Sequence, residues 1–354
     1  MSIAEMIVPD LHRRGVRGRA HNRDSAGWTS TWNAWGTTAS VTVTDPALLP
    51  AADRLVSRHF AATEKAAARF RKDAELHRLY RAGGRPITVS LVLAELVAAA
   101  LAVAERTDGD VDPTVAAAMT AVHGSRHRGR DASTIPACGT RATGSRPVPG
   151  WQQVDLQGRQ LRVPAGTTLD LSATATSVAC DRAAADVRAR LDVGVLVTLG
   201  GDAASAGPAP DGGWSVSIDD RTENGLIEVL LPAGAALATS HFTARPDASD
   251  VDPSPSGHLI DPRTGQPPAA VWRMATAIGF TSLEASTYTA AALIRGVPAR
   301  AWLGQLWVPA RLVTVHDDVI TVGPWSAHTP TSPTTSGNTS FPSPRPANSR
   351  RTTS

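Results

Sequence analysis

The chain has 354 residues, 42% of them hydrophobic, so it is long enough to bury a sizeable core in one large or two modest domains. Its 35 basic and 32 acidic side chains leave a net charge of +3, which is too weak a field to indicate nucleic-acid binding by itself. Lysine occurs only at Lys65 and Lys72 and never follows a glycine, which excludes a P-loop and disfavours Schiff-base chemistry.

The two cysteines, Cys138 and Cys180, match neither a zinc spacing nor a disulfide framework, which favours a reducing compartment. The N-terminal stretch MSIAEMIVPD has no apolar core after a basic start, so no secretory signal is expected. The most apolar window, LVLAELVAAALAVAE, is interrupted by Glu95 and is short for a membrane span. We therefore predict a cytoplasmic protein with no membrane segment.

Composition divides the chain into three parts. Residues 1–27 are polar and arginine-rich, which predicts a disordered basic arm. Residues 326–354 are mostly Ser, Thr, Pro and Asn without any acidic side chain, which predicts a disordered tail. Residues 28–325 remain as one globular domain.

The predicted elements of the first half are a strand and two helices. Residues 36–45 alternate in the manner of a strand. Residues 87–109 predict a helix, with Ser90 as its N-cap and Gly109 after its end. Between them, a long amphipathic helix has side chains at spacings of four and three that form one buried stripe: Val56, Phe60, Thr63, Ala67 and Phe70.

In the second half, strands and helices follow one another. Residues 159–172 predict a strand, 179–192 a helix, and 193–199 a buried strand that ends in a glycine turn. WSVSIDD and GLIEVLLPAG predict paired antiparallel strands, LEASTYTAAALIRG predicts a helix, and ARLVTVHDDVITVG predicts a closing hairpin.

Two acidic or basic clusters carry side chains suited to binding. RFRKDAEL places Arg69 and Arg71 where an arginine fork could hold a phosphate. The same residues could instead form the solvent-exposed end of a helix with no ligand. DGDVDPTV gathers Asp108, Asp110 and Asp112 ahead of a proline. Such a cluster can hold a hard cation or a ribose, or it can cap the start of a helix.

Two loops are further candidates. In LGGD (199–202) the glycines let a backbone approach a ligand and Asp202 can accept hydrogen bonds, but a plain tight turn is equally consistent. SGHLIDPRTG (256–265) contains His258, and histidine titrates near neutral pH, which suits general acid–base catalysis. A lone loop histidine is more often structural, so no segment decides the function alone.

Taken in order, seven segments resemble the signatures of the ApbE-like FAD:protein FMN transferases: GTTASVTV, RFRKDAEL, DGDVDPTV, LDLSATATSVACDRAA, LVTLGGD, HLIDPRTG and LEASTYTAAALIRG. The resemblance covers residues 35–322, and its specificity lies in the order and spacing of the seven segments. The composition, rich in arginine and alanine, is similar to that of family members from high-GC actinobacteria.

The resemblance implies an α+β, T-fold-related architecture, with antiparallel sheets and flanking helices around a flavin cleft. It also implies an enzyme that transfers FMN from FAD to a threonine hydroxyl of an acceptor flavoprotein and releases AMP, with help from a divalent cation such as Mg²⁺. The implied partners are FAD and a flavoprotein that presents a threonine.

The resemblance also assigns roles to single residues. The family's catalytic histidine falls on His258, the base for the threonine hydroxyl, while Asp261 and Arg263 shape the turn that presents it. The flavin-contacting positions fall on Trp35, Asp110, Val111, Asp112, Ser172, Val178 and Ile260. The metal positions fall on the carbonyl of Ala175 and on Ser286, Thr289 and Ala290.

The metal positions depart from the family pattern. Many members carry an Asp and, four residues later, a Thr on the helix after the histidine loop, where both face one cation. Here these residues are Ser286 and Ala290, and a hydroxyl is a poorer Mg²⁺ ligand than a carboxylate. Two alternatives therefore stay open: a non-catalytic FAD-binding homologue, and an FAD pyrophosphatase in which water replaces the threonine hydroxyl.

Overall fold

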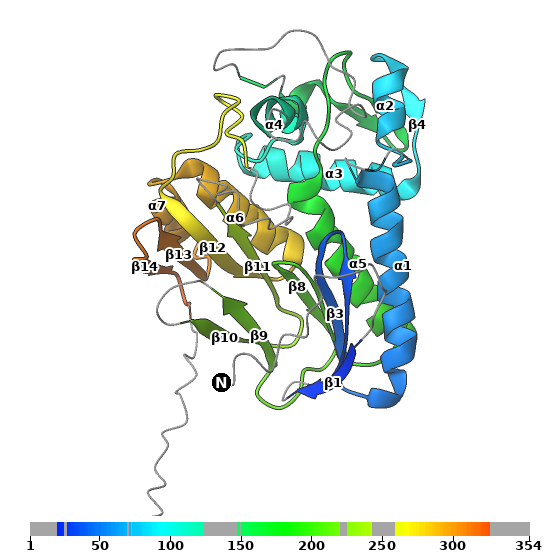
Figure 1. Ribbon diagram of the computed structural model, residues 1–354, viewed down its shortest axis with the longest axis vertical. Coiled ribbons are helices and arrows are strands. Elements are labelled where there is room, and N and C mark those ends of the chain that lie inside the picture. The colour runs from blue at the N-terminus through cyan, green and yellow to red at the C-terminus, as the bar shows by residue number, and fades with distance from the viewer. Residues whose placement is uncertain are drawn as a thin grey trace, which may run out of the picture.

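The computed structural model describes residues 20–24, 27–68, 71, 73–123, 147–148, 150–219, 225–242 and 259–325, and the structural statements below refer to these residues. A nine-stranded antiparallel sheet spans the molecule in the order β1-β2-β3-β7-β8-β11-β12-β13-β14 (Figure 1). Its strands are β1 (Ala20–Asp24), β2 (Gly27–Ala34), β3 (Thr37–Val43), β7 (Val195–Leu199), β8 (Asp202–Ala206), β11 (Ala236–His241), β12 (Trp272–Gly279), β13 (Ala310–Thr314) and β14 (Val319–Val322).

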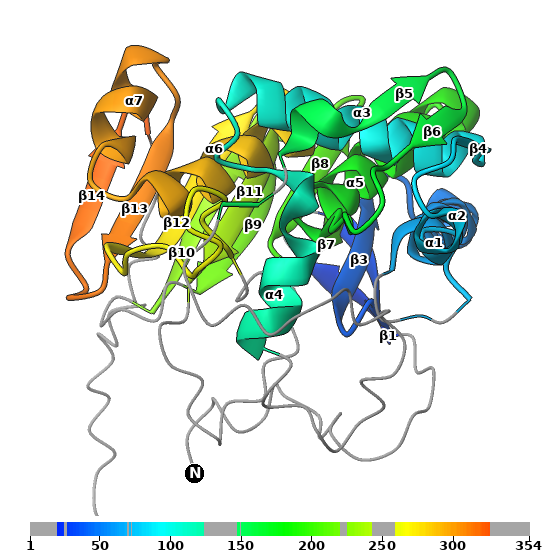
Figure 2. The ribbon, with the colours of Figure 1, turned by 90° about the horizontal axis from the view of Figure 1, so that it is seen from above.

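Helices cover one face of this sheet (Figure 2). The helices are α1 (Leu49–Ala67), α2 (His77–Ala82), α3 (Leu91–Arg106), α4 (Ala116–His123), α5 (Ser172–Leu191), α6 (Ser282–Arg295) and α7 (Ala299–Gln305). None of the described helices combines the length and the apolar character that a membrane span requires. The cytoplasmic location remains a prediction.

A hairpin of β9 (Trp214–Asp219) and β10 (Leu226–Leu231) covers the other face of the sheet. Because alternate side chains of a strand point to opposite faces, Val195 and Val197 of β7 pack with α1 and α5, whereas Leu196 packs with Trp214 of the hairpin. Both faces of β7 are therefore buried, which explains why four of its five residues are apolar. A third, small sheet joins β4 (Ile87–Thr88), β6 (Gln160–Arg162) and β5 (Asp155–Gln157).

Several predicted elements are confirmed. The described members of the α1 stripe, Val56, Phe60, Thr63 and Ala67, are all buried, while Phe70 lies outside the described residues. Ser90 caps α3, its side chain accepting from the amide of Leu93 at 3.1 Å. The two predicted hairpins are β9–β10 and β13–β14, and Gly296 follows α6 as expected.

Two boundaries differ from the sequence prediction. Residues 20–24, assigned to the disordered arm, form β1 because their backbone pairs with β2 along the edge of the sheet. The strand expected over 159–172 is limited to β6, and α5 begins at Ser172, seven residues before the predicted helix at 179. The small side chains of Ala175, Ala179 and Ala183 are almost fully buried, so close packing rather than apolar periodicity selects this helix.

Helices α5 and α6 are joined by a carboxylate. Asp181 of α5 accepts hydrogen bonds from the amides of Ser282 (2.7 Å) and Leu283 (3.0 Å) in the first turn of α6. Thr281 caps the same helix, its hydroxyl accepting from the amide of Glu284 at 3.1 Å. These bonds satisfy amides that have no partner within the helix and fix where α6 begins along α5.

We expect Asp181→Ala to lower the free energy of unfolding by about 1–2 kcal/mol, because two amides of α6 lose their acceptor in a largely buried place. Urea unfolding followed by circular dichroism measures this loss. Glu105→Ala, on the exposed face of α3, is the matched control and should leave the midpoint nearly unchanged. Equal midpoints for the two variants would contradict the role given to Asp181.

Candidate functional site

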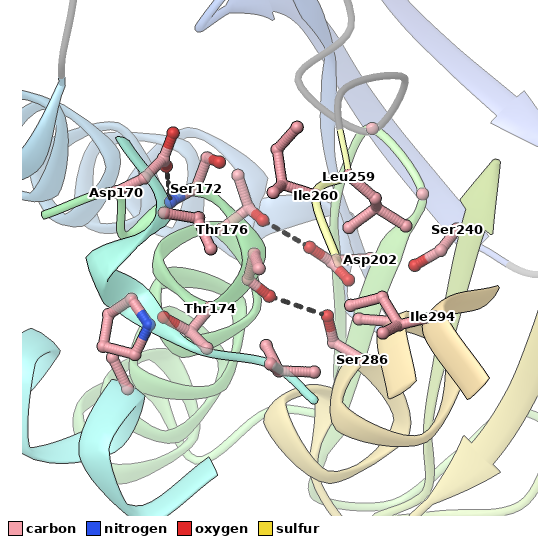
Figure 3. A pocket seen from close by; sticks show the side chains of 18 of the residues that line it. Asp170, Ser172, Thr174, Thr176, Asp202, Ser240, Leu259, Ile260, Ser286 and Ile294 are labelled. Carbon is pink, nitrogen blue, oxygen red and sulfur yellow. Dashed lines mark hydrogen bonds between the residues drawn. The ribbon is translucent and has the colours of Figure 1, made fainter. Parts of the chain in front are cut away.

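A pocket opens where the first half of α5, the turn between β7 and β8, and α6 meet (Figure 3). The segment after α3 (110–113) and the segment before the 261–266 turn complete it. Its carboxyl groups come from Asp110, Asp112, Asp170 and Asp202. Its hydroxyl groups include those of Ser172, Thr174, Thr176, Ser240 and Ser286. Oxygen atoms from segments far apart in the sequence thus line one pocket, together with apolar side chains such as Val111, Leu199 and Ile260.

The β7–β8 turn brings Asp202 to this pocket because two glycines permit a close approach. Gly200 has a φ of +61°, and a Cβ on Gly201 would lie 2.3 Å from the carbonyl oxygen of Thr239 in β11. In place of that clash, the carbonyl of Gly201 accepts from the amide of Thr239 at 2.8 Å. Glycine is therefore required here for β8 to start beside β11.

Asp202 is a buried carboxyl group, with only 9% of the residue exposed. Its Oδ2 accepts a hydrogen bond of 2.5 Å from the hydroxyl of Thr176 on α5. Burial raises the pKa of Asp202 to about 7, the Thr176 hydrogen bond opposes this shift, and the nearby charge of Asp181 adds to it. The pocket therefore holds a carboxyl group that titrates near neutral pH.

Asp110 is paired with arginine. Its Oδ2 accepts from Nε of Arg295, and its Oδ1 lies 3.6 Å from a guanidinium nitrogen of Arg263. Burial raises the pKa of Asp110, while both guanidinium groups oppose the shift. Arg295 is itself held over the ring of Trp302, 4.1 Å from the ring centroid. The charge of Asp110 is thus compensated within the protein.

Two further carboxylates organise the backbone around the pocket. Asp112 accepts from the amide and hydroxyl of Thr114, both at 2.7 Å, and from the amide of Trp151 at 3.0 Å. Asp170 accepts from the amide of Ser172 at 2.7 Å, at the start of α5. Asp112 therefore caps the short 3-10 helix at Pro113–Val115, as the helix-start interpretation of DGDVDPTV predicts, while it also lines the pocket.

The turn that follows His258 is closed by Asp261. Its carboxylate accepts from the amide of Arg263 (2.9 Å) and from that residue's Nε (2.8 Å) and guanidinium (3.1 Å). The expected part of Asp261 and Arg263 in shaping the turn is confirmed. His258 itself lies outside the described residues, but it directly precedes Leu259, which lines the pocket.

Comparison with known proteins identifies the family to which the chain belongs. The model of the ApbE family matches residues 35–310. The chain belongs to the ApbE family. At the level of the family, the protein is therefore a flavin transferase. No curated protein matches the sequence significantly.

Solved structures have the same fold at low sequence identity. The apo form of the Pseudomonas stutzeri flavinyl transferase ApbE has a TM-score of 0.66 and 19% identity, covering 86% of this chain and 95% of that chain. The flavin transferase ApbE from Vibrio cholerae has a TM-score of 0.65 and 20% identity, covering 87% and 98%. The ApbE protein of Thermotoga maritima has a TM-score of 0.66 and 21% identity, covering 86% and 97%. The expected α+β fold with antiparallel sheets is confirmed.

The structure brings most positions suggested by the ApbE resemblance into one pocket. Those lining it are Asp110, Val111, Asp112, Ser172, Ile260, Ser286 and Ala290. Trp35, Val178, Ala175 and Thr289 lie outside its lining. The indole of Trp35 donates to the carbonyl of Phe60 at 3.2 Å, and Val178 packs in the core beside α3. The flavin roles of these residues remain predictions.

The site roles assigned through the family resemblance do not include Asp170, Thr176 or Asp202. The LGGD segment did offer a signal for Asp202, since polar residues after a buried strand and a glycine turn often face a ligand. Thr176 lies in the segment LDLSATATSVACDRAA, but no role was assigned to it. Its contact with Asp202 depends on α5 packing against β8, which no local pattern encodes.

The expected metal positions do not by themselves fit Mg²⁺. The hydroxyl of Ser286 donates to the carbonyl of Ala173 at 3.1 Å, the hydroxyl of Thr289 donates to the carbonyl of Ser286 at 3.1 Å, and Ala290 ends in a methyl group. Ala175, whose carbonyl was expected as a ligand, is 1% exposed. Mg²⁺ prefers charged oxygen ligands, so a cation here needs a carboxylate from another element.

The raised pKa of Asp202 should make the stability of the protein depend on pH. A carboxyl whose pKa rises from 3.8 to about 7 on folding binds its proton more tightly in the folded state, so stability falls as pH rises between these values. Asp202→Asn removes the titration, while its amide oxygen can still accept from Thr176. Relative to the wild type, the free energy of unfolding of the variant should therefore increase between pH 4 and pH 7, by up to about 4 kcal/mol.

Urea unfolding in EDTA at a series of pH values measures this difference in free energy. A difference between variant and wild type that stays constant from pH 4 to pH 8 would contradict the burial of an ionisable Asp202.

Proposed function

We propose that the protein is an FAD:protein FMN transferase that moves FMN from FAD to a threonine hydroxyl of an acceptor flavoprotein, releases AMP and depends on a divalent cation. Membership of the ApbE family supports the transferase class. The observation that carries the proposal is the convergence of Asp110, Val111, Ser172 and Ile260, positions that the family resemblance assigns to flavin, on one pocket.

The proposed reaction is a phosphoryl-type transfer. The threonine oxygen forms a bond to the phosphorus of the FMN half of FAD, the bond from that phosphorus to the bridging oxygen breaks, and AMP leaves with that oxygen. The threonine proton needs an acceptor, and we assign this part to His258. Its sequence neighbour Leu259 lines the pocket, which supports the assignment.

The charge of the pocket supports the dependence on a cation. Asp170 and Asp202 line the pocket together with the paired Asp110 and with Asp112. The pyrophosphate of FAD carries the same sign of charge as these carboxylates, so it would be repelled unless a cation is bound with it. The acidic lining is therefore consistent with a substrate that enters as a complex with a divalent cation.

We expect His258→Ala to abolish FMN transfer while FAD binding stays largely intact, because the substitution removes the base and leaves the described pocket lining unchanged. The assay combines protein, FAD, Mg²⁺ and an acceptor flavoprotein domain, and intact mass analysis detects an added FMN on the acceptor. FAD fluorescence reports binding separately.

His316→Ala is the matched control, since His316 is exposed in the β13–β14 turn and does not line the pocket. It should transfer FMN at the rate of the wild type. Unchanged turnover in His258→Ala would exclude the proposed base.

The serine at position 286 favours one alternative, a homologue that binds FAD without transferring FMN. That protein would retain FAD and leave every acceptor unmodified with each of several cations. An FAD pyrophosphatase would instead produce free FMN and AMP without any acceptor, because water takes the place of the threonine hydroxyl. The same assay, with nucleotides separated by chromatography, distinguishes the three outcomes.

A further inference from the structure

The carboxylates of the pocket differ in how many of their oxygen atoms are already engaged. Both oxygens of Asp110 face guanidinium groups, and both oxygens of Asp112 accept hydrogen bonds. In Asp202, Oδ2 accepts from Thr176, whereas Oδ1 has no hydrogen-bond partner among the described residues. Asp202 is nine-tenths buried and lines the pocket, so this oxygen is available to a ligand.

Asp202 lines the same pocket as Ser286, the position on α6 where the family resemblance leads one to expect an acidic side chain. Figure 3 shows its carboxylate between Thr176 of α5 and Ser286 of α6. Ser286 donates to the carbonyl of Ala173, and Ser240 shares a hydrogen bond of 2.8 Å with Thr289, so neutral oxygen atoms surround the same space. A charged oxygen thus reaches this space from β8 rather than from α6.

We infer that Asp202 provides the carboxylate of a divalent-cation site in this pocket, in place of the acidic residue that α6 lacks at Ser286. The inference rests on the proposed function for its substrate, but the cation site itself is a property of these residues. Mg²⁺ typically keeps several waters and binds proteins through one or two carboxylates together with substrate phosphates. One carboxylate with neutral oxygens nearby therefore suffices when FAD supplies the remaining ligands.

The two positions make a reciprocal test possible. Asp202→Asn removes the charge but keeps an oxygen that can accept from Thr176, so the fold should be retained. Ser286→Asp adds a carboxylate from the facing helix. The double variant Asp202→Asn/Ser286→Asp has the same number of carboxylates as the wild type, with the charge moved from one wall of the pocket to the other. Asp192→Asn, at the exposed end of α5, is the matched control.

The measurement is Mn²⁺ binding to the full chain by electron paramagnetic resonance, with and without FAD. We expect Asp202→Asn to weaken Mn²⁺ binding by about tenfold or more, a loss typical of a disturbed metal site, and Asp192→Asn to leave it unchanged. Ser286→Asp alone should strengthen binding, and the double variant should recover most of the wild-type affinity. FAD should strengthen Mn²⁺ binding to the wild type.

Wild-type Mn²⁺ affinity in a folded Asp202→Asn protein, with folding checked by thermal unfolding, would overturn the inference. So would a double variant that binds Mn²⁺ no better than Asp202→Asn, because the two positions would then not share a cation. Mn²⁺ binding that depends on Asp202 without any FMN transfer would contradict the proposed function and leave the cation site standing. FMN transfer by Asp202→Asn at the Mn²⁺ concentration that the wild type requires would overturn the cation site and leave the proposed function standing.

Discussion

The hydrogen bonds from the first turn of α6 to Asp181 hold together the two helices that form the pocket. Asp181 lies on α5, so accepting from Ser282 and Leu283 sets the position of α6 along α5. One turn further on, the hydroxyl of Ser286 reaches the carbonyl of Ala173. The facing walls of the pocket therefore depend on one carboxylate that never enters it.

Packing around α5 gives the pocket its second wall. The buried alanines at positions 175, 179 and 183 allow the helix to lie close to its neighbours and to the sheet. That closeness brings Thr176 within 2.5 Å of Asp202 on β8. Burial then raises the pKa of Asp202 to about 7, so the site contains a carboxyl group that titrates near neutral pH.

The pairing of charges separates structural carboxylates from available ones. Asp110 is neutralised by Arg295 and Arg263, and Asp112 is used by backbone amides and a threonine hydroxyl. Among the described residues, the carboxylate of Asp202 accepts a hydrogen bond only from the hydroxyl of Thr176. This contrast is the basis of the proposed cation site, in which Asp202 supplies the charged oxygen that α6 lacks at Ser286.

Local patterns were sufficient for elements whose burial is regular. The stripe of α1, the Ser90 cap of α3 and the β9–β10 hairpin follow from spacing and from capping or turn residues. The start of α5 did not, because residues 172–178 are small and polar and alternate as readily as a strand does. Strands β8, β11 and β12 also went unpredicted, since their short alanine- and threonine-rich sequences gain their strand conformation from pairing inside the sheet.

The sequence by itself determined the family, because seven segments in a fixed order and spacing identify it even though each is weak alone. It also pointed to seven of the residues that line the pocket, among them Asp110, Ser172 and Ser286. Only the tertiary structure decided that Asp112 caps a helix start, that Asp110 is paired with arginines, and that Asp202 keeps a free oxygen among the described residues. These distinctions depend on which groups meet across β8, α5 and α6, and the order of residues along the chain does not contain those distances.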